Sequence, residues 1–288
     1  MKVVLAIRKV IIILGVLFAS CSAVLVRAST APSMVLVFYR VLIASLMLSP
    51  FVLWKHDGEW KNIPRKMYVL SVLSGLFLGL HFSAYFESLR HTSIASSVLF
   101  ADMEVFFVAF AMLVFFKEKI SLKGWVGIGV TFLGSVLIAI VDAGSTSNSL
   151  FGDALALSAA AFMSVYTMIG KVCRKYMTTT VYTFLVYLSA AVTVLLLLLL
   201  TGAPLVGYDP INYLIALGLA VFCTLLGHSI YSWGLKYEKA SFISTAKMLD
   251  PVFASSLGII IFREFPPPLV LIGASLVIFG ISFYSKHG

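Results

Sequence analysis

The residues with the most chemical potential in this sequence are ionisable side chains inside long apolar segments. Charged groups are costly in hydrocarbon and normally face a protein interior or a water-filled cavity. A carboxylate in that setting could bind a cation, an ammonium group or a proton, and an arginine could bind a carboxylate or a phosphate. The set consists of Arg40, Asp102, Glu104, Lys247 and Asp250, joined by His81 and His228.

Glu104 and Asp250 are expected at mid-depth in two apolar segments, 146 residues apart. Asp250 precedes Pro251, which removes a backbone hydrogen bond and is expected to kink the helix. A kinked helix with a carboxylate at that depth could bind a cation or take up a proton. Alternatively, Lys247, three residues before Asp250 on one predicted helix face, could neutralise it as a structural ion pair.

Asp102 and Glu104 are two residues apart, about 200° around a continuous helix. We therefore expect one of them to face a narrow cavity and the other to face a neighbouring helix. Arg40 is a natural partner for either carboxylate, because a buried arginine without one is costly. The alternatives for Arg40 are to brace the helices or to bind an anionic group of a ligand.

Histidines and tyrosines on the neighbouring segments are further candidates for the same cavity. His81 and His228 precede the two acidic segments and lie one position off the 146-residue register. Each could equally be a hydrogen-bonded core residue. Tyr85 and Tyr231 continue the same helices, where they could line a path or anchor at an interface. Tyr166 is a weaker candidate of the same kind.

The composition places these segments in a lipid bilayer. The 288 residues are 61% apolar and 11% charged, with a mean hydropathy of +1.05, whereas soluble proteins average about 25% charged residues. Only helices are expected, because the backbone must satisfy its own hydrogen bonds in hydrocarbon. We predict ten spans, at residues 10–27, 33–53, 67–88, 92–116, 122–141, 151–171, 179–201, 211–233, 240–262 and 268–285.

The basic residues predict the orientation of these spans. With the N-terminus inside, sixteen Lys and Arg residues fall in inner segments and three in outer segments. This asymmetry favours cytoplasmic placement of both termini in a multi-pass protein of the cell inner membrane. We interpret residues 10–27 as the first span, not as a cleaved signal peptide, because the second half has a matching first span.

An internal repeat relates the two halves at an offset of 146 residues. Each copy, residues 1–145 and 146–288, is expected to contain five spans, so the copies would be inverted relative to each other. That arrangement is typical of a transporter with its site between the halves. The matching pairs are Tyr85–Tyr231, Leu89–Leu235, Phe107–Phe253, Phe116–Phe262, Glu118–Glu264, Gly127–Gly273 and Gly134–Gly280.

The glycine pairs lie on the fifth and tenth predicted spans, which otherwise have apolar interiors. Small residues allow close helix contact in membranes. We expect these two spans to be outer support helices, and a homodimer through them is a further hypothesis.

Other function classes have little support in the sequence. The net charge of +9 comes from basic residues spread over span ends, which argues against a nucleic-acid surface. The three cysteines have no metal-ligand or redox spacing, and no enzyme or nucleotide-binding motif is present. We predict no cofactor, no metal and no enzymatic activity.

Two segments resemble the repeats of the EamA family in the drug/metabolite transporter superfamily. They are Ser93–Gly134, with Phe116-Lys117-Glu118, and Ser241–Gly280, with Asp250-Pro251-Val252-Phe253 and Phe262-Arg263-Glu264. Arg40 also stands where the first repeat of this family often has an arginine. The resemblance implies ten helices in two inverted five-helix repeats around a central cavity, and it implies structural or gating roles for Glu118 and Glu264.

The leading hypothesis is a secondary transporter of a small polar or zwitterionic metabolite, such as an amino acid or a related compound, working by alternating access. Coupling to protons through Glu104 or Asp250 and exchange without protons are both compatible with the residues. The alternatives are an exporter of drugs or organic cations with the same fold, and a non-transporting membrane sensor or assembly partner.

Overall fold

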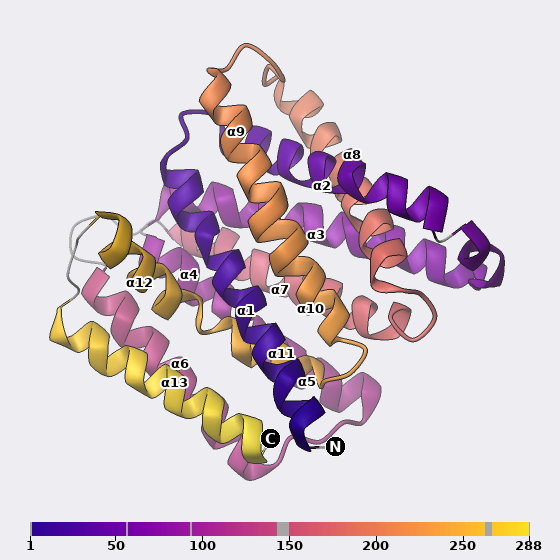
Figure 1. Cartoon of the computed structure of the whole chain (residues 1–288). Coiled ribbons are helices and arrows are strands. Elements are labelled where there is room, and N and C mark those ends of the chain that lie inside the picture. The colour runs from indigo at the N-terminus through magenta and orange to yellow at the C-terminus, as the bar shows by residue number, and fades with distance from the viewer. Residues whose placement is uncertain (1, 56, 93, 143–149, 263–266, 288) are drawn as a thin grey trace.

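The computed structural model describes residues 2–55, 57–92, 94–142, 150–262 and 267–287, and this part of the chain is all-helical (Figure 1). The first half contains α1 (Lys2–Arg27), α2 (Ser33–Lys55), the 3₁₀ helix η1 (Asp57–Asn62), α3 (Arg65–His91), α4 (Ile94–Asp102), α5 (Glu104–Phe116) and α6 (Leu122–Asp142). The second half contains α7 (Leu150–Cys173), α8 (Thr179–Thr201), α9 (Pro210–Gly218), the π-helix η2 (Leu219–His228), α10 (Ser229–Gly234), α11 (Ala240–Lys247), α12 (Asp250–Phe262) and α13 (Pro268–His287).

Eight helical segments in the described part are long and apolar enough to cross a membrane. A further apolar helix, Leu122–Ile138, is shorter. Helices of this kind satisfy their backbone hydrogen bonds internally, as hydrocarbon requires. The eight segments are Val3–Val26, Ser33–Trp54, Arg65–His91, Ser97–Phe116, Leu150–Cys173, Thr179–Thr201, Pro210–Gly234 and Pro268–His287.

Two of the predicted spans are each divided into two helices. The predicted span 92–116 is α4 and α5, which are separated at Met103, and the predicted span 240–262 is α11 and α12, which are separated at Met248 and Leu249. At both breaks the chain makes 3₁₀ turns, from Met103 N–H to Phe100 O (3.3 Å) and from Met248 N–H to Thr245 O (3.2 Å).

The second break, at Met248 and Leu249, lies in the turn before Pro251, where the proline kink was expected. α12 begins at Asp250, so Pro251 lies in the first turn of a new helix, where a missing N–H does little harm. The first half breaks at Met103 without any proline. Proline is therefore not the common cause of the two breaks.

The packing of α6 against α13 forms one edge of the bundle, where the two helices run side by side (Figure 1). The paired glycines lie in this contact. A Cβ at Gly134 would come within 2.6 Å of Gly273 O, and one at Gly280 within 2.7 Å of Thr131 N. The glycines predicted from the sequence to allow close helix contact thus lie between α6 and α13 of the same chain.

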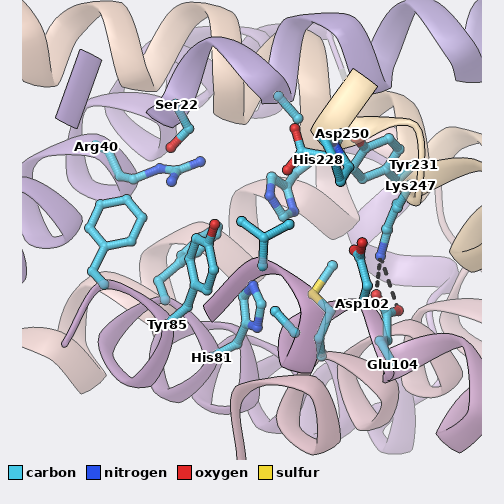
Figure 2. Close-up of a pocket in the computed structure, with 17 residues that line it drawn as sticks. Ser22, Arg40, His81, Tyr85, Asp102, Glu104, His228, Tyr231, Lys247 and Asp250 are labelled. Atoms are coloured by element: carbon cyan, nitrogen blue, oxygen red, sulfur yellow. Dashed lines mark hydrogen bonds and ion pairs between the residues drawn. The ribbon is translucent and has the colours of Figure 1, made fainter. Parts of the chain in front are cut away.

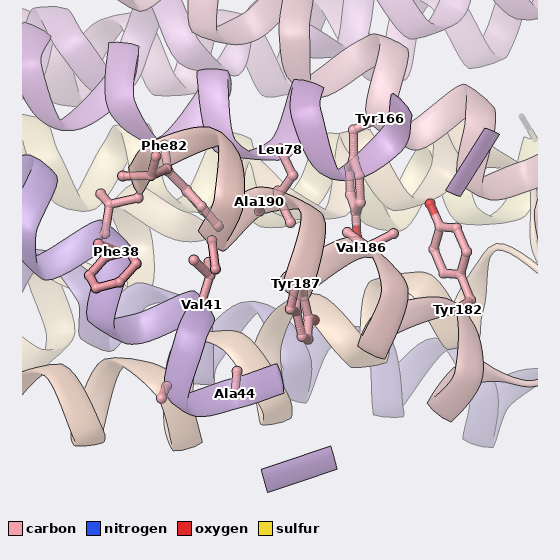
Figure 3. Packing of buried hydrophobic residues seen from close by; sticks show 14 of the residues in the cluster. Phe38, Val41, Ala44, Leu78, Phe82, Tyr166, Tyr182, Val186, Tyr187 and Ala190 are labelled. Atoms are coloured by element: carbon pink, nitrogen blue, oxygen red, sulfur yellow. The ribbon is translucent and has the colours of Figure 1, made fainter. Parts of the chain in front are cut away.

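The remaining helices surround the middle of the bundle. α3 packs on α7 and α8, α2 on α8, α1 on η2 and α12, and α5 on α7 and α11. The largest apolar cluster lies among α2, α3, α7 and α8, and Figure 3 shows its side chains interdigitating. Its labelled members are Phe38, Val41, Ala44, Leu78, Phe82, Tyr166, Tyr182, Val186, Tyr187 and Ala190.

Candidate functional site

A cavity of about 140 Å³ lies between the two halves, at the level of the helix breaks (Figure 2). Nine of the ten residues predicted to line a site do line this cavity, together with Pro251. These nine are Arg40, His81, Tyr85, Asp102, Glu104, His228, Tyr231, Lys247 and Asp250. The other lining residues are Ala19, Ser22, Phe82, Phe86, Val98, Ala101 and Met163.

Glu104 and Lys247 form an ion pair across the base of the cavity. Lys247 Nζ lies 3.0 Å from each carboxylate oxygen of Glu104. Thr167 and Ser244 also donate hydroxyl hydrogen bonds to Glu104 Oε1, at 3.0 and 3.1 Å. The Glu104 side chain, 5% exposed, therefore has its charge neutralised and its hydrogen-bonding capacity largely used.

This pairing corrects three expectations from the sequence. Lys247 contacts Glu104 and not Asp250, because the break between α11 and α12 removes the i,i+3 relation assumed for a continuous helix. Asp102 and Glu104 both line the cavity, because Met103 interrupts the helix between them. Arg40 forms no ion pair with either carboxylate among the described contacts.

Arg40 comes from α2 and is 2% exposed. Its Nε donates to Thr224 Oγ1 at 3.0 Å, and its Cζ lies 4.1 Å from the centre of the Phe82 ring. Thr224 lies in the π-helix η2, where its own hydroxyl donates to Leu219 O five residues back. These contacts hold the guanidinium so that its end points into the cavity (Figure 2).

Asp102 and Asp250 reach the cavity from the side opposite Arg40 (Figure 2). Asp102 is the last residue of α4, and Asp250 is the first residue of α12. Asp102 Oδ2 and Asp250 Oδ1 are buried, with no hydrogen-bond partner among the described residues. A buried carboxyl oxygen without a partner is costly, so both atoms are candidates for a ligand or a proton.

Aromatic and imidazole rings form the walls of the cavity. His81 Nδ1 lies 2.9 Å from Ala159 O, a hydrogen bond in which Nδ1 carries the proton, and the ring stacks on Tyr85. His228 packs edge-on against Phe82 and Tyr231 and has a buried Nδ1 without a described partner. His228 lies three residues before Tyr231, as His81 lies four before Tyr85, and both spacings share a helix face.

Tyr166 is the predicted site residue that lies elsewhere. It is buried in the apolar cluster, and its hydroxyl makes a 2.8 Å hydrogen bond with Ser232 Oγ. Sequence reasoning missed Thr167, Ser244 and Thr224, which hold Glu104 and Arg40. Hydroxyl residues are frequent in apolar helices, so no signal in the sequence distinguishes these three.

The cavity lies away from the end of the bundle that contains both termini, because α1 contributes Ala19 and Ser22 from its C-terminal third. Beneath it, polar contacts within the second half join the end of α7 to α10 and to the segment after α10. Buried Arg174 donates from Nε to Ser232 O (3.0 Å), and Lys171 Nζ donates to Glu238 O (2.7 Å). Burial raises the pKa of the Glu238 carboxyl, and nearby Lys9 opposes the shift.

Among the described residues, no group of three or more His, Cys, Asp or Glu side chains is arranged to hold a metal ion. The side chains of Phe262, Arg263 and Glu264, which the resemblance singled out, lie outside the described part. Nothing is therefore assigned to the proposed gating glutamate of the second half.

Comparison with known proteins connects this site to a family. The model of the EamA-like transporter family matches the chain twice, over residues 8–140 and 150–286. An uncharacterized transporter from Archaeoglobus fulgidus is 26% identical over 251 residues, which cover 85% of this chain and 85% of the relative.

Two bacterial relatives have the same description. An uncharacterized transporter from Clostridium kluyveri is 31% identical over 198 residues, covering 67% of this chain and 63% of the relative. The uncharacterized transporter YxxF of Bacillus subtilis is 27% identical over 245 residues, covering 83% and 76%. A solved crystal structure with 18% identity covers 96% of both chains at a TM-score of 0.80, so the two share a fold.

Proposed function

We propose, because this chain belongs to the EamA-like transporter family of the drug/metabolite transporter superfamily, that it is a secondary transporter of a small polar or zwitterionic metabolite. The cavity between the halves carries this proposal. Charged side chains from both halves, Arg40 and Asp102 from the first and Asp250 from the second, line one cavity. A membrane transporter binds its solute in such a place and exposes it to each side in turn.

Ten spans in two inverted repeats are part of the proposal. Under inversion, α2 corresponds to α8, α5 to α12 and α6 to α13. The packing supports this relation, because α2 contacts α8, α6 contacts α13, and the α3–α7 contact has its counterpart in α1–η2. The breaks support it as well, since Met103 and Leu249 are 146 residues apart. We assign residues 1–145 and 146–288 to the two repeats.

The proposed orientation has both termini in the cytoplasm, in the cell membrane or, in a cell with two membranes, the inner one. Most Lys and Arg residues lie in the N-terminal segment and in the connections predicted to be on the same side as the N-terminus. The cavity then lies towards the outer side of the membrane.

The charges of the cavity support a polar solute over a purely lipophilic one. An arginine without an acidic partner among the described residues lies opposite two carboxyl groups with unpartnered oxygens. Desolvated charges of both signs are complementary to a solute that also carries both signs. A lipophilic cation would leave Arg40 buried and uncompensated, which is costly.

Flux into liposomes that contain only this protein tests the proposal. Labelled amino acids, organic anions and organic cations are offered separately, and we expect saturable uptake of a polar or zwitterionic solute. Asp250→Asn should reduce uptake at least tenfold, while the exposed control Asp209→Asn should not. Uptake confined to lipophilic cations would instead establish the organic-cation exporter, and absence of flux for every solute would favour a non-transporting protein.

We further propose that transport is coupled to protons, and that Asp102 or Asp250 carries the proton when the solute is absent. Both have buried carboxyl oxygens without described partners, whereas Glu104 is already neutralised by Lys247. A pH gradient should then drive uptake in wild-type liposomes. Uptake that is indifferent to the gradient, with Asp102→Asn and Asp250→Asn both active, would contradict the coupling and leave transport itself intact.

A further inference from the structure

The cavity contains three charged groups that have no ion-pair partner among the contacts of the described residues. Five charged side chains line it, but Glu104 and Lys247 neutralise each other at 3.0 Å. Arg40, Asp102 and Asp250 remain. With Asp102 and Asp250 ionised and the lining histidines and tyrosines neutral, as when a cationic ligand is bound, these three groups present one positive and two negative charges to the interior of the cavity.

Arg40 forms an anion subsite. Its Nε is occupied by Thr224, and its planar face is covered by Phe82 at 4.1 Å and Phe86 at 5.8 Å. These contacts fix the plane of the guanidinium and leave its terminal nitrogens directed at the cavity (Figure 2). A fixed guanidinium with two free nitrogens matches the two oxygens of a carboxylate.

Asp102 and Asp250 form a cation subsite on the opposite side of the cavity (Figure 2). They belong to different halves of the chain and approach from α4 and α12, so one small ligand can contact both. Each presents a buried carboxyl oxygen that lacks a partner among the described residues. Positively charged groups with N–H donors satisfy such oxygens.

The balance of charge selects among ligands that could contact both subsites. A dicarboxylate or a phosphate compound would satisfy Arg40 and be repelled by the two aspartates. A simple zwitterion would satisfy Arg40 and one aspartate. A diamine would satisfy both aspartates and leave Arg40 without an anion. One carboxylate combined with two cationic groups satisfies all three side chains.

We propose that the cavity binds a small amino acid with a second cationic group, of the lysine and ornithine type. Its carboxylate binds Arg40, and its two ammonium groups bind Asp102 and Asp250. This inference rests on the proposed function for its biological meaning, but the binding itself is a property of the cavity and can be measured without transport.

Calorimetric titration of the purified wild-type protein with four related probes tests the charge pattern. L-Lysine has all three charges, L-norleucine lacks the side-chain ammonium, 1,5-diaminopentane lacks the carboxylate, and Nε-acetyl-L-lysine is uncharged at the side chain. We expect lysine, or its shorter homologue ornithine, to bind at least about tenfold more tightly than the other three, as expected for the loss of one charged hydrogen bond. These measurements need no variant.

Variants then assign the groups. Arg40→Gln should weaken lysine binding to the level of 1,5-diaminopentane, and leave the affinity for the diamine itself unchanged or higher. Asp250→Asn should weaken lysine binding. Norleucine has one ammonium group, so only one of Asp102→Asn and Asp250→Asn should weaken norleucine binding, and that variant identifies the partner of the α-ammonium group. The matched controls are the exposed Arg65→Gln and Asp209→Asn, which should bind as wild type. Thermal unfolding of each variant confirms that it is folded, and Asp102→Asn replaces Asp250→Asn if the latter is not.

Two results would overturn the inference. Norleucine could bind as tightly as lysine with uptake of one proton, which would identify a proton as the third charge. Alternatively, none of the basic amino acids could bind while another solute is transported in liposomes; the proposed function would then stand without this ligand. If lysine binds with the expected pattern but no flux is measured, the ligand assignment would stand and the proposed transport function would be contradicted.

Discussion

Lys247 Nζ lies 3.0 Å from both carboxylate oxygens of Glu104, although the two residues are 143 positions apart and belong to different halves of the chain. The contact joins the end of α11 to the beginning of α5, so it connects the two broken helices directly. Of the five charged residues that line the cavity, it neutralises two and leaves Arg40, Asp102 and Asp250 without an ion-pair partner among the described residues. Both the stability of the bundle and the chemistry of the cavity depend on this division.

Removing one partner of this pair should destabilise the protein strongly. Lys247→Met leaves the Glu104 carboxylate buried with only two hydroxyl donors, and we expect a loss of about 3–5 kcal/mol in the free energy of unfolding. The double variant Glu104→Leu with Lys247→Met should lose less than the single one, because no charge is left unpaired. Unfolding in mixed detergent micelles measures both, and a double variant less stable than the single would contradict this account.

The proposed position of the cavity towards the outer side predicts a pattern of chemical labelling. In a background without Cys21, Cys173 and Cys223, Ser22→Cys should react with a membrane-impermeant thiol reagent added outside cells. Ser241→Cys, which lies in the packed region of α11 beneath the cavity, should be protected. Labelling of Ser241→Cys but not Ser22→Cys from outside would show that the proposed orientation is inverted.

Glu238 should make stability depend on pH. Burial holds the pKa of its carboxyl above the ordinary value of 4.5, so the folded state binds the proton more tightly than the unfolded state. Its contribution to stability is then complete below the unfolded pKa and is lost as pH rises through the folded pKa. Glu238→Gln cannot titrate, so its stability relative to wild type should increase from about pH 4 to about pH 7. Unfolding free energies at the two pH values provide the measurement, and a constant difference would contradict the prediction.

Close contact between α6 and α13 should make Gly280 intolerant of a side chain. A Cβ there would lie 2.3 Å from Thr131 Oγ1 and 2.7 Å from Thr131 N, so the helices must move apart. We expect Gly280→Ala to cost about 1–3 kcal/mol, as overpacking does. Gly129→Ala is the control, because a Cβ at Gly129 meets nothing within 4 Å.

The same pair of substitutions separates packing from general effects on helices. Alanine favours a helix over glycine by about 0.5–1 kcal/mol, so Gly129→Ala should be neutral or slightly stabilising. Thermal unfolding in detergent measures both variants. Equal behaviour of the two would mean that the close approach of α6 and α13 does not contribute to stability.

Much of the architecture could be predicted from the sequence, because long apolar segments and the distribution of Lys and Arg specify helices and their ends. The breaks could not be predicted in full. Pro251 drew attention to one of them. Methionine favours helices, so the residue at the first break, Met103, gives no signal, and that break depends on tertiary packing. The π-helix η2 likewise has no pattern in the sequence.

The sequence indicated which residues lie around the cavity, but it did not indicate which of them pair with one another. Ionisable residues in apolar segments were expected to face an interior space, and Arg40, Asp102 and Asp250 line one. Partners were inferred from spacing on continuous helices, and the breaks invalidate that spacing. Lys247 pairs with Glu104 and not with Asp102 or Asp250 because of contacts between segments that are far apart in the chain.

Glu104 and Asp250 stand at matching positions of the two halves, and each begins the helix that follows a break. Only Glu104 forms an ion pair with a lysine among the described residues, so the two matching positions would have different roles. Glu104 would stabilise the contact between the two broken helices, whereas Asp250 would have no such structural role and could be replaced more easily. Selection for a new solute would then act mainly on Asp250 and its surroundings, while Glu104 would tolerate little variation.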